Sequence, residues 1–352
     1  MLAPIHRSMD TKNSRESERK EWWRPRAQQL AEYITHELGK TSDVVLLQEF
    51  WFDDDFISLF DDITSGIFDR VSERRPGYMI SLDGSVRKDK PREDGMAVLV
   101  NKKRTGLKLK ILNSDQVLTG PQRIAQLVTC QDEFDRYVTI ANTHLSFPSH
   151  ADCNVNQERQ RNEMMTIVQA LSDKHTNNQQ ARLEIIGGDF NSNSRSLAAE
   201  CLESTPYNFV NCASASAEQS LISGSGGRIN LGVTHRTHRG EDVSVDHIFT
   251  RLVHNEEIHE KKQSFLVNDN NRKSYLRLGY LDNKGTRVID CTRGKVELEG
   301  TSLISDHRPV IATLDWPDFS SQYKLNQDIY FNSEGFNMPL DPLEPPWGFS
   351  EE

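Results

Sequence analysis

Carboxylate, amide and imidazole side chains lie at the ends of several predicted strands of this chain. The most informative stretch, residues 184–191, reads Glu-Ile-Ile-Gly-Gly-Asp-Phe-Asn. Its β-branched run predicts a buried strand, and the two glycines after it allow a sharp turn and a close approach of the backbone. Asp189 and Asn191 would then be presented at the carboxyl end of a strand, where open α/β sheets bind their ligands.

Four further stretches place polar groups beside predicted strands. These groups are Glu49 after the run 43–48, Asn142 and His144 after 137–141, Asp246 and His247 within 244–250, and Ser305, Asp306 and His307 before 308–314. Each has a structural interpretation as well, because an acid after a strand usually caps a turn and a single histidine usually lies satisfied in the core or on the surface. Groups that end adjacent strands can nevertheless converge on one cleft. Two or three hard oxygen ligands, completed by water, hold Mg²⁺ or Mn²⁺ for phosphoryl chemistry.

Helices and strands alternate in the parts of the chain that would position these groups. Apolar residues recur at helical spacing within 22–38 and 156–171, and a further helix is predicted over 53–68. The basic stretch 70–92 predicts an exposed loop. Mostly antiparallel strands are predicted from their alternation and turns over 96–100, 107–112, 124–130 and 137–141. A helix that leads into a buried strand is typical of the α/β class.

The composition is that of a globular protein with an ample core. Of the 352 residues, 36% are hydrophobic and 27% charged. The net charge of −10, from 42 basic and 52 acidic residues, argues against a protein that coats polyanions nonspecifically. No apolar run approaches the ~20 residues of a membrane span, and no signal peptide opens the chain. Scattered cysteines without Cys-x-x-Cys spacing predict an intracellular location, cytoplasmic or nuclear, and argue against zinc.

All of these motifs fall within residues 1–317, which we expect to form one catalytic domain. The highly charged stretch 255–299 predicts an insertion, with a hairpin around 280–286, and its acids lack the spacing of a calcium-binding loop. Residues 318–352 show no periodicity and predict a C-terminal tail. The sequence leaves the oligomeric state open.

Five motifs in this order resemble the endonuclease/exonuclease/phosphatase superfamily. They are Leu-Gln-Glu at 47–49, Asn-Thr-His-Leu at 142–145, Gly-Asp-Phe-Asn at 188–191, Val-Asp-His-Ile-Phe at 245–249 and Ser-Asp-His-Arg-Pro-Val at 305–310. The stretches Pro-Gln-Arg-Ile-Ala-Gln at 121–126 and His-Arg-Thr-His-Arg-Gly at 235–240 resemble its deadenylase-like branch, of the carbon-catabolite-repressor type. The resemblance implies an α/β fold of four layers, with two packed mixed β-sheets flanked by helices.

The resemblance also assigns a metal site and a nucleophile. Glu49 would be the main carboxylate ligand of a divalent ion, Mg²⁺ or Mn²⁺, and Asp306 would assist it. Asp189 would orient and deprotonate the attacking water, and Asn191 would position that water. In-line hydrolysis needs such a positioned nucleophile and a cation for the charge on the leaving oxygen.

The remaining assigned residues would contact the phosphate and the substrate. His307 would hold an oxygen of the scissile phosphate, and Asp246 would keep His307 protonated. His144 and Asn142 would donate hydrogen bonds to the phosphate, and Arg123 would bind the substrate. Donors on the nonbridging oxygens stabilise the charge that develops there.

The start of the chain departs from the family pattern. Members begin with a central strand that ends in an asparagine ligand, and Met1 stands where the residue after that asparagine belongs. We therefore expect this first central strand to be missing, which favours a natural start further upstream over an impaired site.

The substrate is the least determined feature. The resemblance to the deadenylase-like branch implies single-stranded RNA, cleaved from its 3′ end, as the leading hypothesis. The chain lacks the motifs of inositol phosphatases, the apolar anchor of membrane-bound sphingomyelinases and the basic composition of apurinic endonucleases. Alternatives are a phosphatase or phosphodiesterase for a small molecule or lipid headgroup, and a binding protein with impaired catalysis.

Aromatic residues near the motif ends could stack bases or lie in the core, and they are Trp51, Phe52, Phe147 and Tyr207. His235 and His238 are candidates for the rim of the site, whereas His247 points to the opposite strand face from Asp246 and is predicted to be structural.

Overall fold

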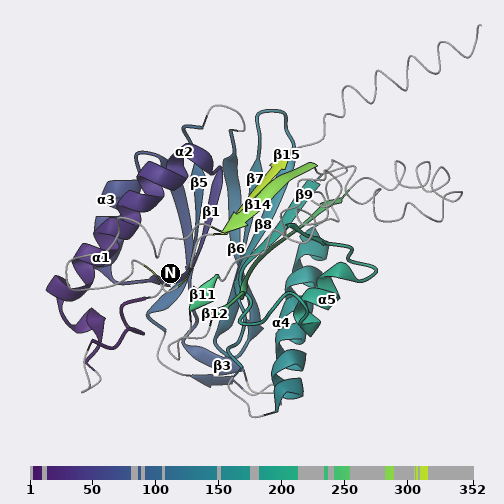
Figure 1. The fold of residues 1–352 in the computed structure, drawn as a ribbon, viewed down its shortest axis with the longest axis horizontal. Helices are drawn as coiled ribbons and strands as arrows, with labels where there is room; N and C mark the ends of the chain where they lie inside the picture. The colour runs from purple at the N-terminus through teal and green to yellow at the C-terminus, as the bar shows by residue number, and fades with distance from the viewer. Residues whose placement is uncertain are drawn as a thin grey trace, which may run out of the picture.

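Four layers make up the fold, with helices on the outer faces of two β-sheets that pack against each other (Figure 1). The computed structural model describes residues 3–9, 14–80, 86–88, 92–104, 108–148, 152–174, 182–212, 234–236, 242–253, 282–288, 305, 307 and 310–315. The predicted α/β sandwich is confirmed. Within the described residues one sheet is wholly antiparallel and the other is mixed.

The first helical layer covers a three-stranded sheet of order β1-β5-β2. Aromatic side chains fill the space between them, and Trp23, for example, lies edge-on to Trp51 with 5.3 Å between ring centroids. Burial of large aromatic side chains contributes much of the stability of such a layer. The elements of this half are η1 (Glu16–Glu18), α1 (Lys20–Tyr33), the π-helical turn η2 (Ile34–Leu38), α2 (Gly39–Thr41), β1 (Val44–Trp51), α3 (Asp54–Thr64), β2 (Phe68–Arg74) and β5 (Asp94–Asn101).

The second sheet has six strands in the order β10-β13-β9-β8-β7-β6, and helices α4 and α5 lie against it (Figure 1). Strands β8 and β9 are parallel, and the long helix α4 connects them. The other pairs are antiparallel. The elements of this half are β6 (Lys110–Gly120), β7 (Arg123–Gln131), β8 (Tyr137–His144), α4 (Cys153–Asp173), β9 (Arg182–Asp189), α5 (Leu197–Glu203), β10 (Val210–Asn211) and β13 (Asp246–Val253).

Three short two-stranded pairs complete the described structure. They are β3 (Tyr78–Ile80) with β4 (Val86–Lys88), β11 (His235–Arg236) with β12 (Asp242–Val243), and β14 (Asp282–Val288) with β15 (Val310–Asp315). Strand β14 lies inside the predicted insertion, and it pairs with β15 where the sequence predicted a local hairpin. The rest of the insertion and the predicted tail 318–352 lie outside the described residues. Among the helices that the structure describes, none combines the length and apolarity that crossing a membrane requires.

Two glycines let β9 approach its neighbours closely. A Cβ atom on Gly187 would meet Cδ1 of Leu46 in the other sheet at 2.7 Å. Gly188 has a φ of +141°, and a Cβ atom there would lie 2.0 Å from the carbonyl oxygen of Thr143. Only glycine adopts such a backbone conformation without strain. The glycine pair thus sets the position of Asp189, the next residue.

We expect Gly188→Ala to lower the free energy of unfolding by about 3 kcal/mol, because it adds a backbone clash to an unfavourable φ. Urea denaturation followed by circular dichroism measures this loss. Gly66→Ala is the matched control, since nothing lies within 4 Å of a Cβ atom at that glycine. Equal stability of the two variants would contradict the role given to Gly188.

Candidate active site

Three adjacent strands bring acidic and imidazole groups to one end of the second sheet. His144 at the end of β8 pairs in register with Asp189 at the end of β9, and Asp189 pairs with Asp246 at the start of β13. Because β13 runs antiparallel to β9, its first residue lies beside the carboxyl ends of β8 and β9. The structure therefore brings these three predicted site residues together.

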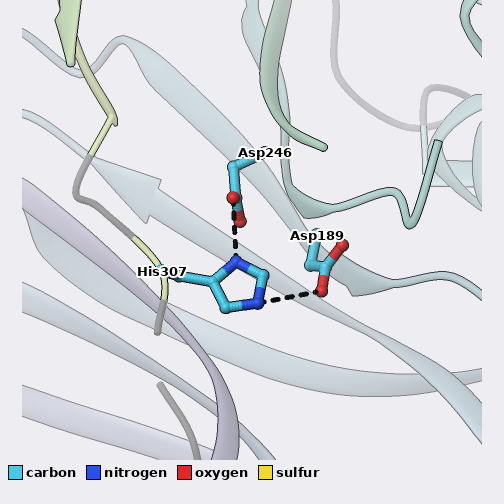
Figure 2. A group of neighbouring side chains, drawn as sticks. All are labelled: Asp189, Asp246 and His307. Atoms are coloured by element: carbon cyan, nitrogen blue, oxygen red, sulfur yellow. Dashed lines mark hydrogen bonds and ion pairs between the residues drawn. The ribbon is translucent and has the colours of Figure 1, made fainter. Parts of the chain in front are cut away.

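His307 bridges the two aspartates of this cluster (Figure 2). Its Nδ1 lies 2.9 Å from Oδ2 of Asp246, and its Nε2 lies 3.7 Å from Oδ2 of Asp189. The ring of His235 stacks on that of His307 with 4.1 Å between centroids. The predicted pairing of Asp246 with His307 is thus present in the geometry. His238, the other rim candidate, lies outside the described residues.

Asp189 lies at the centre of the cluster. Its Oδ1 accepts a hydrogen bond of 2.7 Å from the backbone N–H of Asn191, and its Oδ2 lies 3.6 Å from Nε2 of His144. Burial, with the charges of Asp246 and Glu49, raises the pKa of Asp189 to about 7, against the opposing effects of His307 and the Asn191 N–H. A carboxyl group with this pKa can exchange a proton near neutral pH.

Asn191 is held by contacts with the neighbouring loop. It has a φ of +50°, and its Nδ2 donates to the carbonyl oxygen of Leu145 at 2.9 Å. Gln160 of α4 donates to the carbonyl oxygens of Ser146 at 2.7 Å and of Phe190 at 3.2 Å. Helix α4 thereby fixes the loops that follow β8 and β9.

Glu49 reaches the site through a β-bulge. The buried strand predicted over 43–48 is present as β1, which continues through Glu49 to Trp51. The register between β1 and β5 shifts at Gln48 and Phe50, and Glu49 takes a φ of +55°. A bulge of this kind re-aims a side chain and occurs often beside active sites. The Oε2 of Glu49 accepts the N–H of Ala3 at 3.2 Å.

The residues present fit a divalent cation. Asp246 pairs in register with Asp189, and the charges of Asp246 and Glu49 both raise the pKa of Asp189. Like charges gathered in a buried position repel one another unless a cation or a proton neutralises them. The carboxylates of Asp189 and Asp246, which lie on either side of His307, supply negative charge that a cation beside Glu49 would neutralise. Asp306, the second predicted metal ligand, lies outside the described residues.

Asn142 does not reach the cluster, although the family resemblance implied a phosphate contact. Its side chain is 0% exposed and lies between the two sheets. Its Oδ1 accepts from Nε2 of Gln48 at 2.6 Å, and its Nδ2 donates to the carbonyl oxygens of Leu47 and Ala97, each at 3.0 Å. The hydrogen bonds of Asn142 therefore join β8 to β1 and β5, a structural position at odds with the predicted role in substrate binding.

Two arginines flank His144. Arg123, the predicted substrate-binding residue, donates from Nη1 to the carbonyl oxygen of His144 at 3.4 Å. Burial and the nearby charge of Arg75 lower the pKa of Arg123 to about 10, so its guanidinium group is still charged at neutral pH. Arg75 donates to Nδ1 of His144 at 2.8 Å.

Local sequence patterns do not predict the position of Arg75. We predicted an exposed loop over 70–92, yet residues 68–74 form β2 and Arg75 is only 4% exposed. Two adjacent arginines in a basic stretch indicate a solvated surface when they are judged by composition alone. The buried partners of Arg75 come from distant parts of the chain.

The other candidates divide between core and surface. His247 is buried, and its Nε2 lies 2.9 Å from the carbonyl oxygen of Ser192, in agreement with its predicted structural role. Trp51 lies in the core, and Phe52 and Tyr207 are partly buried against the core clusters. Phe147 is 59% exposed, three residues after His144. Of the four aromatic candidates, Phe147 alone has a mostly exposed side chain.

Comparison with known proteins connects this geometry to a family. The sequence profile of the Endonuclease/Exonuclease/phosphatase family matches residues 13–307. The chain belongs to this family. Members of the Endonuclease/Exonuclease/phosphatase family hydrolyse phosphoesters, generally with divalent metal ions. No curated protein matches the chain by sequence.

Several solved structures share the fold of this family member at low identity. An endonuclease/exonuclease/phosphatase from Bacteroides vulgatus is 16% identical, with a TM-score of 0.55 over 88% of this chain and 96% of that one. The human Nocturnin catalytic domain with bound sulfate anion is 17% identical, with a TM-score of 0.52 over 85% and 88%. The mannosyl-6-phosphatase of Bacteroides thetaiotaomicron is 13% identical, with a TM-score of 0.55 over 88% and 97%.

Proposed function

We propose that this protein is a metal-dependent phosphodiesterase that hydrolyses single-stranded RNA from its 3′ end. The observation that carries the hydrolytic part is the position of Asp189. Its Oδ2 lies between Nε2 of His144 at 3.6 Å and Nε2 of His307 at 3.7 Å. One carboxylate between two imidazoles is suited to take a proton from a water while the two rings hold the oxygens of the phosphate.

Each residue has a distinct task in this reaction. Asp189, once ionised, accepts a proton from the attacking water, and Asn191 helps to position that water. His307 is kept protonated by Asp246, 2.9 Å away, and donates from Nε2 to a nonbridging oxygen. His144 donates to the phosphate from the other side. Donors that are fixed before the reaction stabilise the transition state without reorganisation.

Glu49 and Asp306 would hold the divalent ion, for which Mg²⁺ is the first candidate and Mn²⁺ the second. When bound, the ion supplies positive charge for the developing charge on the leaving oxygen. The bulge at Glu49 and the effect of the Glu49 charge on the pKa of Asp189 support this assignment. Carboxylate oxygens are the ligands that a hard cation such as Mg²⁺ prefers.

RNA is proposed from the resemblance to deadenylase-like proteins and from the exposed ring of Phe147. An aromatic ring beside a phosphate site can stack on a base. The structural likeness to human Nocturnin and to a bacterial mannosyl-6-phosphatase supports the fold only, at 17% and 13% identity. A phosphatase or phosphodiesterase for a small molecule or lipid headgroup is the second candidate, because it would use the same hydrolytic cluster of Asp189, His144 and His307.

One panel of substrates tests the proposal. Purified protein with Mg²⁺ or Mn²⁺ is given 5′-labelled poly(A), mixed RNA, DNA, sphingomyelin, inositol phosphates and a phosphorylated dinucleotide. We expect laddered shortening of the RNA substrates. Hydrolysis of small phosphates alone would replace RNA by the second candidate, and no hydrolysis of any substrate would indicate a binding protein without catalysis.

The same assay tests the metal site. We expect a chelator to abolish hydrolysis and Mg²⁺ to restore it, and we expect Glu49→Gln to raise the Mg²⁺ concentration for half-maximal activity about tenfold or more. Glu37→Gln is the matched control, since the side chain of Glu37 is 61% exposed on the helical layer. An unchanged Mg²⁺ requirement in Glu49→Gln would remove Glu49 from the metal site.

A further inference from the structure

Both ring nitrogens of His144 face charged groups of the protein. The Nη2 atom of Arg75 lies 2.8 Å from Nδ1, and Oδ2 of Asp189 lies 3.6 Å from Nε2. The side chain of His144 is only 8% exposed. Its protonation pattern is therefore set by these protein groups more than by solvent.

A guanidinium group donates hydrogen bonds and has no acceptor. The Nδ1 atom of His144 must consequently accept from Arg75, and in a neutral ring the proton then lies on Nε2. His307 is arranged in the opposite way, because its Nδ1 faces the acceptor Oδ2 of Asp246 at 2.9 Å and carries a proton. The two rings present Nε2 to the same oxygen of Asp189 but are fixed by groups of opposite charge.

Arg75 cannot easily turn away from His144. It is 4% exposed, its Nη1 lies 3.1 Å from Oδ2 of Asp94, and its backbone N–H donates to the carbonyl oxygen of Asp94 at 3.1 Å. Asp94 is 0% exposed and also contacts His6 at 3.4 Å and Arg92 at 3.3 Å. Buried, paired groups of this kind have few alternative arrangements.

Two electrostatic effects agree with a neutral ring. Burial, followed by the charges of Arg75 and Arg123, lowers the pKa of His144 well below its ordinary value of 6.5. Burial opposes the ionisation of Asp94, but His6, Arg75 and Arg92 together lower its pKa, so Asp94 stays an anion beside Arg75. The pair that orients His144 is thus charged at neutral pH.

We propose that Arg75 is a positioning residue that holds His144 as the neutral Nε2–H tautomer, which makes His144 a permanent hydrogen-bond donor to the bound phosphate. The phosphate as acceptor rests on the proposed function, whereas the tautomer does not. A ring fixed in this way cannot accept a proton from the attacking water through Nε2, so Asp189 is left as the proton acceptor.

Nuclear magnetic resonance of the full chain labelled with ¹⁵N at its histidine rings tests the tautomer directly. Long-range ¹H–¹⁵N correlations distinguish a protonated ring nitrogen from a bare one, and His144→Gln identifies the signals of His144 by their loss. We expect a protonated Nε2 and a bare Nδ1 in the protein with and without Mg²⁺. A protonated Nδ1 with a bare Nε2, or an imidazolium ring at neutral pH, would overturn the inference.

Variants of Arg75 show whether this residue is the cause. We expect Arg75→Met to change the tautomer signature of His144, whereas Arg75→Lys keeps a cationic donor and restores it. Arg123→Gln is the matched control, because Arg123 contacts the carbonyl oxygen of His144 and not its ring. An unchanged signature in a folded Arg75→Met would overturn the role of Arg75. If Arg75→Met does not fold, the double variant Arg75→Met/Asp94→Asn removes the buried unpaired anion, and the spectrum of the wild type still tests the tautomer.

Hydrolysis assays separate the two claims. We expect Arg75→Met to lower kcat about tenfold to a hundredfold with little change in KM, as for the loss of one oriented donor in the transition state. If the tautomer is as proposed but the wild type hydrolyses no phosphoester, the proposed function fails while the assignment of Arg75 holds. If hydrolysis occurs but His144 carries its proton on Nδ1, the inference alone fails.

Discussion

Asp189→Asn is expected to abolish hydrolysis while it stabilises the fold. Asparagine has nearly the same shape and keeps an oxygen for the N–H of Asn191, but it cannot accept a proton from water. We expect kcat to fall about 10³-fold or more, in the range seen when a general base is removed. Initial rates with Mg²⁺ for the wild type and the variant measure this loss.

The stability effect has a definite dependence on pH. Folding raises the pKa of Asp189 from 3.8 to about 7, so the folded state binds the proton more tightly than the unfolded state. Below pH 4 both states are protonated and the carboxyl group has no cost. Stability is then lost as pH rises from about 4 to 7, because the buried carboxylate becomes charged. Without this charge, Asp189→Asn should be more stable than the wild type by about 1–3 kcal/mol above pH 7, measured by urea denaturation with a chelator present.

Asp246→Asn serves as the matched control with the opposite sign. Burial opposes the charge of Asp246, but the charge of His307 and the hydrogen bonds from His307 and Thr234 lower its pKa. A lowered pKa means that Asp246 stabilises the fold at neutral pH and that this contribution is lost on acidification. We therefore expect Asp246→Asn to destabilise the protein at pH 7. A loss of stability in Asp189→Asn above pH 7 would contradict the electrostatic account of the cluster.

Asn142→Ala is expected to lower the free energy of unfolding by about 4 kcal/mol, because three buried hydrogen bonds are lost and their partners stay buried. The partners are Nε2 of Gln48 and the carbonyl oxygens of Leu47 and Ala97. Gln48 precedes Glu49, and Asn142 lies two residues before His144. The variant should therefore also misplace one sheet relative to the other and reduce hydrolysis.

Urea denaturation measures the stability of Asn142→Ala. Asn113→Ala on β6 is the control, because Asn113 is exposed and its Nδ2 donates at 3.1 Å to Asp115, two residues further along the same strand. We expect the control to change the free energy of unfolding by less than about 0.5 kcal/mol. A cost below about 1 kcal/mol for Asn142→Ala would show that the hydrogen bonds between the sheets contribute little.

The part of the site that the sequence predicted best depends on local patterns. An apolar run followed by glycines, an acid and an amide already fixes the end of β9, so Asp189 and Asn191 lie where they were expected. His144 and Asp246 were found for the same reason, since each is at an end of its strand. The α/β class followed from the alternation of helix and strand patterns, whereas the order of the four layers was expected from the family resemblance.

The features that the sequence did not predict depend on pairing between distant segments. The bulge at Glu49 exists only in the register of β1 against β5, and no local pattern marks it. Asn142 and His144 share one face of β8, and only the position of the other sheet decides that Asn142 is buried between the sheets while His144 reaches their edge. The contact of Arg75 with His144 joins residues 69 positions apart.

The central claim is that Asp189 must be ionised to accept a proton from the attacking water, and the pH dependence of kcat/KM tests it most directly. Hydrolysis of one RNA substrate would be followed with saturating Mg²⁺ from about pH 4 to 9. Ionisation of one group predicts a rate that rises with pH and levels off above about 7, and a cation at Glu49 shifts this rise to lower pH. A rate that shows no rise with pH, or one that Asp189→Asn reproduces, would contradict the account.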